Sequence, residues 1–296
     1  MNKHVIFKGA STALITPLKN DRIDYENFEK LIEFQISSGI SALVFLGTTG
    51  ESPTIEDNER TEIIKFAVST VKNRVPVIIG TGSNSTEKAK KHTKEAYALG
   101  ADAALVVTPY YNKTTQEGLI SHYEKIATCD IPIILYNVPS RTGIGIEPST
   151  YNRLSKTQNI CAVKEASTDI AKFIDTLALS GDLLSFYSGN DNLTVPMMSM
   201  GAEGVISVAS NIIPLIISNL CKKCLENDYK AASSIQKDIN TLVQLLFSRV
   251  NPIPIKAAVA QIGLCENELR LPLLALKDTE VESLFKEIQK IGAKPQ

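Results

Sequence analysis

The chain has 296 residues, with 31 Lys and Arg against 32 Asp and Glu, which gives a formal net charge of −1 at pH 7. An apolar content of 44% is sufficient for a buried core, and a balanced charge without a basic run gives no electrostatic reason to expect a nucleic-acid partner. The N-terminal apolar stretch ends at Lys8 after three residues, and the longest uncharged run, 204–221, contains polar residues and Pro214. We therefore expect a soluble chain with neither a signal peptide nor a membrane span.

Eight short apolar runs, rich in Val, Ile and Leu, recur along the chain. They are residues 10–16, 41–47, 76–82, 103–109, 131–137, 160–166, 184–190 and 204–210. Most lack an alternation of apolar and polar residues, which is typical of parallel strands covered on both faces. The segments between them have helical periodicity; in 25–38, for example, Phe28, Leu31, Ile32 and Ile36 share one side.

Helix-start signals agree with this reading. Acidic residues follow Thr54 and Thr86, and Pro148 stands where a first helical turn accepts proline. Beyond residue 210 the pattern is helical only, over about 212–227, 229–248, 252–263 and 279–292, with prolines between several of the segments.

Eight strand–helix units, spaced roughly 20–35 residues apart, predict an α/β fold of the (β/α)8 TIM-barrel type. The alternative is an open doubly wound sheet, which would favour a dinucleotide fingerprint where this chain reads Thr16-Pro17-Leu18-Lys19. We therefore predict a catalytic barrel over residues 1–227 and a C-terminal helical extension, 228–296, packed on the barrel.

The five cysteines do not suggest a disulfide framework, because their number is odd and they are scattered: Cys129, Cys161, Cys221, Cys224 and Cys265. Cys221 and Cys224 form a C-x-x-C pair, but no second pair completes a four-ligand zinc site. We expect no metal and a reducing, cytoplasmic environment.

In a barrel of this type the active site lies at the carboxyl ends of the strands, and Lys164 is the unusual residue there. Strand geometry places Ile160, Ala162 and Lys164 on one face and Val163 on the other. If that face is the barrel interior, desolvation lowers the pKa of the lysine and yields a neutral amine suited to Schiff-base formation with a carbonyl. The alternatives are a structural lysine paired with Glu165 or another acid, or Lys256 as the reactive amine.

Hydroxyl groups at neighbouring strand ends could transfer protons during a reaction at such an amine. Tyr136 ends the strand before the one that carries Lys164, while Thr48 and Tyr111 could pass protons between Tyr136 and solvent. The backbone N–H groups of 47–50 are suited to a small anion, a carboxylate more than a phosphate. Each residue also has a structural interpretation: a tyrosine packs its ring, and threonines cap helices.

Six segments in order, at strand ends or in the helical tail, together resemble the pyruvate-dependent class I aldolases. They are 46–52, 108–113, 136–143, 163–166, 204–208 and 251–256. The pattern is most similar to the dihydrodipicolinate synthase branch, and the run Tyr-Asn-Val-Pro-Ser-Arg-Thr at 136–142 separates it from the N-acetylneuraminate lyases and sugar-acid aldolases.

The resemblance implies a lyase of diaminopimelate and lysine biosynthesis that needs neither cofactor nor metal. Lys164 would form an imine with pyruvate, whose enamine attacks L-aspartate 4-semialdehyde to give 4-hydroxy-tetrahydrodipicolinate. Alternatives are a pyruvate-releasing aldolase acting on a 2-keto sugar acid, and a catalytically silent barrel that only binds.

The resemblance also implies the roles of individual residues. Tyr136, Thr48 and Tyr111 would form the proton relay, and Thr49 would join Thr48 in holding the pyruvate carboxylate. The remaining implied substrate-binding residues are Arg141, which would clamp the carboxylate of the second substrate, and Gly189 and Ile206, which would line the pocket. A homotetramer built as a dimer of dimers is implied, with Tyr111 crossing the tight-dimer interface.

One departure from the family concerns feedback regulation. Members inhibited by lysine use a His and a Glu near the loops after the second and third strands, where this chain has Asp57-Asn58-Glu59-Arg60 and Asn84–Lys88. Lys88 stands where the acid would be, while Asn84 and Tyr110 remain. Because a cationic Lys88 would repel a lysine effector, we expect weak or absent inhibition.

Overall fold

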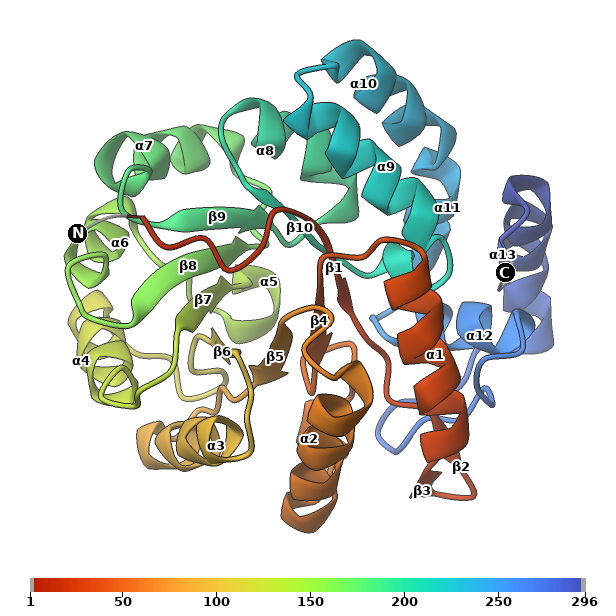
Figure 1. Cartoon of the computed structure of the whole chain (residues 1–296), viewed down its shortest axis with the longest axis horizontal. Coiled ribbons are helices and arrows are strands. Elements are labelled where there is room, and N and C mark those ends of the chain that lie inside the picture. The colour runs from red at the N-terminus through yellow and green to blue at the C-terminus, as the bar shows by residue number, and fades with distance from the viewer. Residues whose placement is uncertain (1–2, 294–296) are drawn as a thin grey trace.

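Eight parallel strands close into a barrel in the computed structural model, which describes residues 3–293 (Figure 1). The barrel strands, in order around it, are β1 (Gly9–Ala13), β4 (Ala42–Phe45), β5 (Val77–Gly80), β6 (Ala103–Val107), β7 (Ile133–Asn137), β8 (Ile160–Glu165), β9 (Ser185–Ser188) and β10 (Gly204–Ser207), which pairs with β1. Each overlaps a predicted run, and most end earlier than predicted because the last residues of the run turn into the loop that follows. The predicted (β/α)8 barrel is confirmed.

A helix follows each barrel strand and covers it from outside. These helices are α1 (Tyr25–Ser37), α2 (Asp57–Val71), α3 (Thr86–Ala98), α4 (Gln116–Ile126), α6 (Pro148–Leu154), α7 (Ile170–Ser180), α8 (Thr194–Ser199) and α9 (Pro214–Leu225). Their starts follow local chemistry: Asp24 and Ser85 cap α1 and α3, and Pro148 is the first residue of α6. Small additional elements are the hairpin β2 (Leu18–Lys19) and β3 (Arg22–Ile23), the short helix α5 (Pro139–Thr142) and 3-10 turns at Ser52–Thr54, Asp191–Leu193 and Ala209–Asn211.

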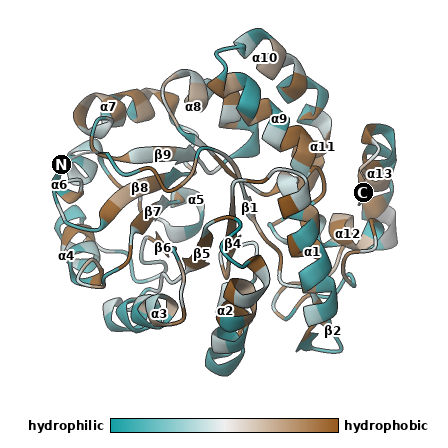
Figure 2. Cartoon of the chain, in the orientation of Figure 1, coloured by the Kyte–Doolittle hydropathy of each residue, from teal (hydrophilic) through white to brown (hydrophobic). Residues whose placement is uncertain are grey.

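The apolar side chains form two layers, one on each side of the barrel wall. The larger layer lies between the strands and the helices, and Phe28, Leu31 and Ile32 of α1 belong to it. The smaller layer fills the barrel and includes Val44, Leu105, Tyr136, Ala162 and Ile206. Most of the barrel strands consist of apolar residues, while the polar residues of the helices face outward (Figure 2).

The prediction that Ile160 shares the face of Ala162 and Lys164 is wrong. Ile133 pairs with Ile160 but Ile134 pairs with Ala162, so Cys161 is an extra residue in β8. Ile160 therefore packs in the outer layer, whereas Cys161 and Ala162 belong to the interior one. A β-bulge of this kind changes which face of the strand a residue occupies, and it cannot be recognised in a run of apolar residues when the inserted residue is apolar too.

The C-terminal extension consists of α10 (Tyr229–Asp238), α11 (Asn240–Leu246), α12 (Ile253–Gln261) and α13 (Asp278–Ile291). The single helix predicted over 229–248 is therefore wrong, because the chain bends at Ile239, between Asp238 and Asn240, two weak helix formers. The bend buries Ile239 together with Leu242. In Figure 1, α10 lies beside α9 of the barrel and α13 stands beside α12.

Across residues 3–293, no helix is both long and apolar enough to cross a membrane. The division of the chain at residue 227 stays a prediction, since the extension packs directly on the barrel through the contact of α10 with α8 and α9.

Candidate active site

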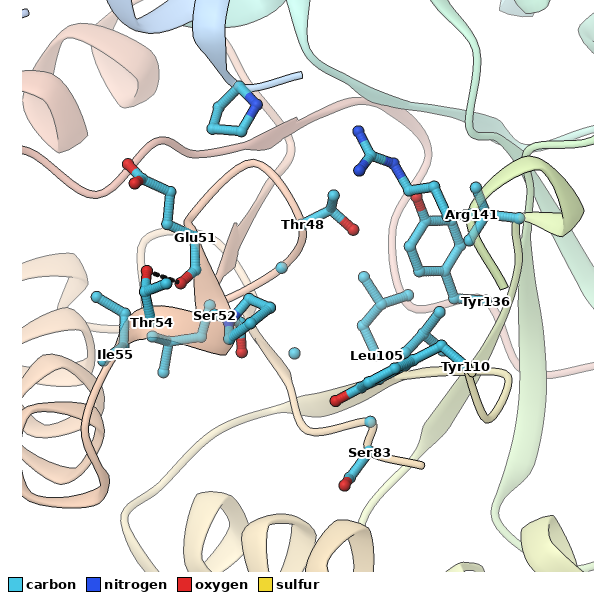
Figure 3. A pocket seen from close by; sticks show the side chains of 18 of the residues that line it. Thr48, Glu51, Ser52, Thr54, Ile55, Ser83, Leu105, Tyr110, Tyr136 and Arg141 are labelled. Carbon is cyan, nitrogen blue, oxygen red and sulfur yellow. Dashed lines mark hydrogen bonds between the residues drawn. The ribbon is translucent and has the colours of Figure 1, made fainter. Parts of the chain in front are cut away.

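A cavity of about 430 Å³ opens at the carboxyl ends of β4 to β7. The loop after β4 contributes Thr48, β7 contributes Tyr136, and α5 contributes Arg141. These three side chains face the same space from different strands (Figure 3). Residues 250–252 and 272–273 of the C-terminal extension close the remaining side.

Lys164 lies beside Tyr136, which lines this cavity. The two residues are paired across β7 and β8, and the Nζ atom of Lys164 is 4.6 Å from the centre of the Tyr136 ring. The lysine is 4% exposed. Among residues 3–293, its amine takes part in no ion pair and no hydrogen bond. The predicted proximity of Tyr136 and Lys164 is therefore present, and the amine is sheltered and unengaged.

Glu165, the alternative partner of Lys164, is bound elsewhere. Its carboxylate accepts hydrogen bonds from Asn137 Nδ2 at 2.9 and 3.0 Å and from the Tyr151 hydroxyl at 2.8 Å. Burial, followed by the charge of Glu165, raises the pKa of Tyr151 well above its ordinary value. The structural interpretation, in which Glu165 neutralises Lys164, does not describe this site.

Lys256, the rival reactive amine, is a structural residue here. Its side chain is fully buried, forms an ion pair with Glu51 Oε1 at 2.8 Å and donates to the Thr16 carbonyl at 2.6 Å. The charge of the Lys256 amine is therefore matched by a buried carboxylate, whereas the Lys164 amine is free of such a partner in the described chain. This contrast favours Lys164 as the nucleophile.

The loop that joins β4 to α2 is held in a fixed, partly strained shape. Leu46 and Glu51, which flank its glycines and threonines, both have φ of 55°. The Gly50 and Glu51 amides donate to the carbonyls of Gly47 and Thr48, and the Thr16 hydroxyl donates to the Gly50 carbonyl at 2.8 Å. Within residues 3–293, no acceptor takes the N–H groups of Thr48 and Thr49. Two N–H groups of the loop are therefore without an acceptor among the described residues.

Asn251 links this loop to Arg141. Its Nδ2 donates to Thr49 Oγ1 at 3.0 Å, and its carbonyl accepts from Arg141 Nη2 at 2.8 Å. Asn251 and Thr49 are 8% and 2% exposed. The link ties the two predicted carboxylate-binding positions to the C-terminal extension.

Five predicted site residues are not among those that line this cavity: Lys164, Thr49, Tyr111, Gly189 and Ile206. Tyr111 is 92% exposed, with φ of 74°, and Tyr110 occupies the cavity wall in its place (Figure 3). Ile206 is fully buried in the barrel interior. Gly189 donates to the Glu165 carbonyl at 2.7 Å and has no room for a side chain, because a Cβ there would come within 2.6 Å of Ala166 Cβ.

Several ionisable groups of the barrel are buried, and two of them, Arg60 and His92, line the cavity. Burial raises the pKa of Asp191, whose carboxylate accepts from Ser207 Oγ at 2.5 Å and from the amides of Val208 and Ala209 at 3.0 and 3.2 Å. On the side of the cavity near α2 and α3, burial lowers the pKa of Arg60 to about 10 and that of His92 to about 4. The guanidinium of Arg60 donates to the Gly80 carbonyl.

In the part of the chain that the structure describes, no group of three or more His, Cys, Asp or Glu side chains could hold a metal ion. All five cysteines are buried free thiols. Burial raises the pKa of Cys224 to about 11 and also raises that of Cys221, which makes both members of the C-x-x-C pair weak nucleophiles.

Two residues of the site were not selected from the sequence. From the sequence, Tyr110 is included in the segment 108–113 and in an effector site, and Asn251 is included as the first residue of the segment 251–256, but neither residue is assigned to the active site. The sequence feature that could have drawn attention to Asn251 is its position immediately before the segment Pro-Ile-Pro-Ile-Lys at 252–256.

Comparisons with known proteins agree on one family. Residues 6–291 match the model of the dihydrodipicolinate synthetase family. The 4-hydroxy-tetrahydrodipicolinate synthase of Alkaliphilus oremlandii is 47% identical over 96% of this chain and 99% of its own length.

Solved structures lead to the same family. The dihydrodipicolinate synthase of Thermotoga maritima superposes with a TM-score of 0.95 at 41% identity, covering 97% of this chain and 99% of that one. A chloride-inhibited dihydrodipicolinate synthase from Acinetobacter baumannii, determined with pyruvate, has a TM-score of 0.95 at 40% identity and covers 98% and 100% of the two chains.

Proposed function

This chain belongs to the dihydrodipicolinate synthetase family, and from that premise we propose how its residues perform the reaction. It is a lyase that condenses pyruvate with L-aspartate 4-semialdehyde to 4-hydroxy-tetrahydrodipicolinate, a step of diaminopimelate and lysine biosynthesis. The observation that carries the assignment of residues is the buried amine of Lys164, which forms no ion pair among the described residues and lies beside Tyr136, a residue that lines the same cavity as Thr48 and Arg141.

Lys164 is the nucleophile in this proposal. Its neutral amine attacks the ketone carbon of pyruvate, and loss of water leaves an imine. Loss of a proton from the methyl group gives an enamine, whose terminal carbon bonds to the aldehyde carbon of the semialdehyde. The amino group of the second substrate then attacks the imine carbon, closes the ring and releases the Lys164 amine, so that no redox partner is needed.

Hydroxyl groups move the protons that these steps require. The Lys164 amine lies over the Tyr136 ring, and we assign the phenol of Tyr136 to exchange protons with the imine and the enamine. Thr48 is the next hydroxyl in the cavity (Figure 3). Tyr111 is exposed on this chain, and we assign it to the relay of a neighbouring subunit.

The two substrates are held by their carboxylates. The free N–H groups of Thr48 and Thr49, with the Thr49 hydroxyl, suit the carboxylate of pyruvate. The guanidinium of Arg141 suits that of the semialdehyde, because its planar donors match the two carboxylate oxygens. Gly189 and Ile206 act indirectly, by keeping the barrel interior below the imine closely packed.

A borohydride trap tests the assignment of the nucleophile. Pyruvate with borohydride should add one reduced adduct per chain, which peptide mapping should locate at Lys164, and Lys164→Ala should abolish both adduct and turnover. An adduct on another lysine, or normal turnover by Lys164→Ala, would refute the proposal. Release of pyruvate from a 2-keto sugar acid, without turnover of the semialdehyde, would favour the sugar-acid aldolase, and absence of any adduct would favour a binding protein.

We also propose a homotetramer formed from tight dimers, located in the cytoplasm. The exposed Tyr111, for which this chain offers no pocket among its described residues, supports a neighbouring subunit at that surface. Sedimentation velocity at several concentrations measures the assembly, and Tyr111→Phe should lower kcat.

A further inference from the structure

Asn251, a residue of the C-terminal extension, touches both carboxylate-binding positions of the proposed site. It lies in the turn between α11 and α12, 202 residues from Thr49 and 110 residues from Arg141 along the chain. Its side chain contacts Thr49 and its main chain contacts Arg141. No other described residue is hydrogen-bonded to both.

The direction of the hydrogen bond to Thr49 decides what that hydroxyl can do. Because Thr49 Oγ1 accepts from Asn251 Nδ2, its own proton is not used in this contact. A hydroxyl is both a donor and an acceptor, so the proton remains available for an anion bound at the loop. The side chain of Asn251 thus leaves the Thr49 hydroxyl free to act as a donor to another group.

The contact with Arg141 works through a different atom. The Asn251 carbonyl accepts from one terminal nitrogen, Nη2, at 2.8 Å. In the described part of the chain Arg141 has no carboxylate partner, so its remaining N–H groups and its charge are available to a ligand. The carbonyl therefore holds the guanidinium at the cavity without neutralising it.

We infer that Asn251 is a positioning residue, which orients the Thr49 hydroxyl toward the carboxylate of the first substrate while its carbonyl fixes the guanidinium that binds the second. The inference rests on the proposed function. It assigns to the helical extension a direct part in substrate binding, since the same segment also fixes Glu51, at the end of the Thr48–Thr49 loop, through Lys256.

The substitution Asn251→Asp tests this role because it keeps shape and main chain but replaces the Nδ2 donor by an acceptor. The Thr49 hydroxyl must then donate to residue 251, and a negative charge stands beside the pyruvate carboxylate. We expect KM for pyruvate to rise by about tenfold or more, KM for the semialdehyde to change less because the carbonyl to Arg141 is retained, and kcat at saturating pyruvate to stay within about threefold.

Two further variants separate positioning from folding. Asn227→Asp, at an exposed turn, adds the same charge far from the site and should leave both KM values unchanged. Thr49→Val and Asn251→Ala should each raise KM for pyruvate, and together they should raise it no more than the larger single effect, because both remove the same contact.

The outcomes distinguish this inference from the proposed function. If the wild-type protein forms no borohydride adduct with pyruvate, the proposed function fails. If it forms the adduct and turns over, but Asn251→Asp keeps KM for pyruvate within twofold, the positioning role is refuted. Loss of kcat and thermal stability without a change in KM would likewise overturn it, because that is what a merely structural residue does.

Discussion

Replacing Lys256 by methionine separates the structural lysine from the reactive one. Methionine keeps the length and the unbranched stem of the side chain, but it leaves the carboxylate of Glu51 buried without its cation. The carboxylate retains only the Arg270 amide, at 3.2 Å, among its partners in the described chain.

The expected cost follows from burial. The side chains of Lys256 and Glu51 are 0% and 1% exposed, and their charged atoms are 2.8 Å apart. Removing one partner of a buried pair costs about 3–5 kcal/mol of unfolding free energy. With an unfolding entropy of about 2.1 cal/mol/K per residue, this corresponds to a fall in Tm of about 5–8 °C for a chain of this length.

The assay is thermal and urea unfolding at one protein concentration, combined with the pyruvate–borohydride trap. Lys256→Met should unfold earlier and still carry its adduct at Lys164, whereas Lys164→Met should lose the adduct at little cost in stability because its amine is unpaired. The double variant Lys256→Met/Glu51→Gln should be more stable than the sum of the single effects by about 2 kcal/mol. A cost below about 1 kcal/mol for Lys256→Met, or loss of its adduct, would refute the reasoning.

Two further predictions concern lysine and acid. L-lysine at millimolar concentration should inhibit weakly or not at all, because the cationic Lys88 lines the cavity and Asp57 is already paired with Lys91 at 3.2 Å. Half-maximal inhibition below 1 mM in initial-rate assays would contradict this prediction. Burial lowers the pKa of His122 to about 4, so the unfolded chain binds more protons as the pH falls from about 6.5 to 4 and stability is lost over that range. Tm measured between pH 7.5 and 4.5 should fall less steeply for His122→Gln, and parallel curves would exclude this histidine as a cause.

The barrel could be predicted because each of its strands is a separate apolar run. Because these strands are covered on both faces, their apolar residues identify them without any pattern specific to the neighbouring strand. Successive parallel strands then lie side by side in this fold. That rule alone brings Tyr136 of β7 next to Lys164 of β8, and the pairing of these two residues confirms it. The bulge at Cys161 escaped prediction because an inserted residue of the same apolar type leaves the composition of the run unchanged.

The side of the cavity that the C-terminal extension closes could not be predicted from the local sequence pattern. Asn251 meets Thr49 and Lys256 meets Glu51 only because α12 folds back over the barrel, and neither helical periodicity nor turn residues specify that path. The surroundings of Tyr111 are beyond any single-chain argument, since its side chain points into solvent on this chain.

Two lysines that look alike in the sequence, each following apolar residues, acquire opposite chemistry from their partners. Lys256 gains a buried carboxylate and a carbonyl as direct partners, while Lys164 gains an aromatic face and, among the described residues, no ion pair. The same ion pair holds the far end of a loop that contains two non-glycine residues with positive φ, a conformation that costs of order 1–3 kcal/mol per residue. Reactivity at Lys164 and the shape of the adjacent anion-binding loop therefore both depend on a charge placed in the extension, which is a physical reason for a barrel enzyme to keep helices beyond its eighth strand.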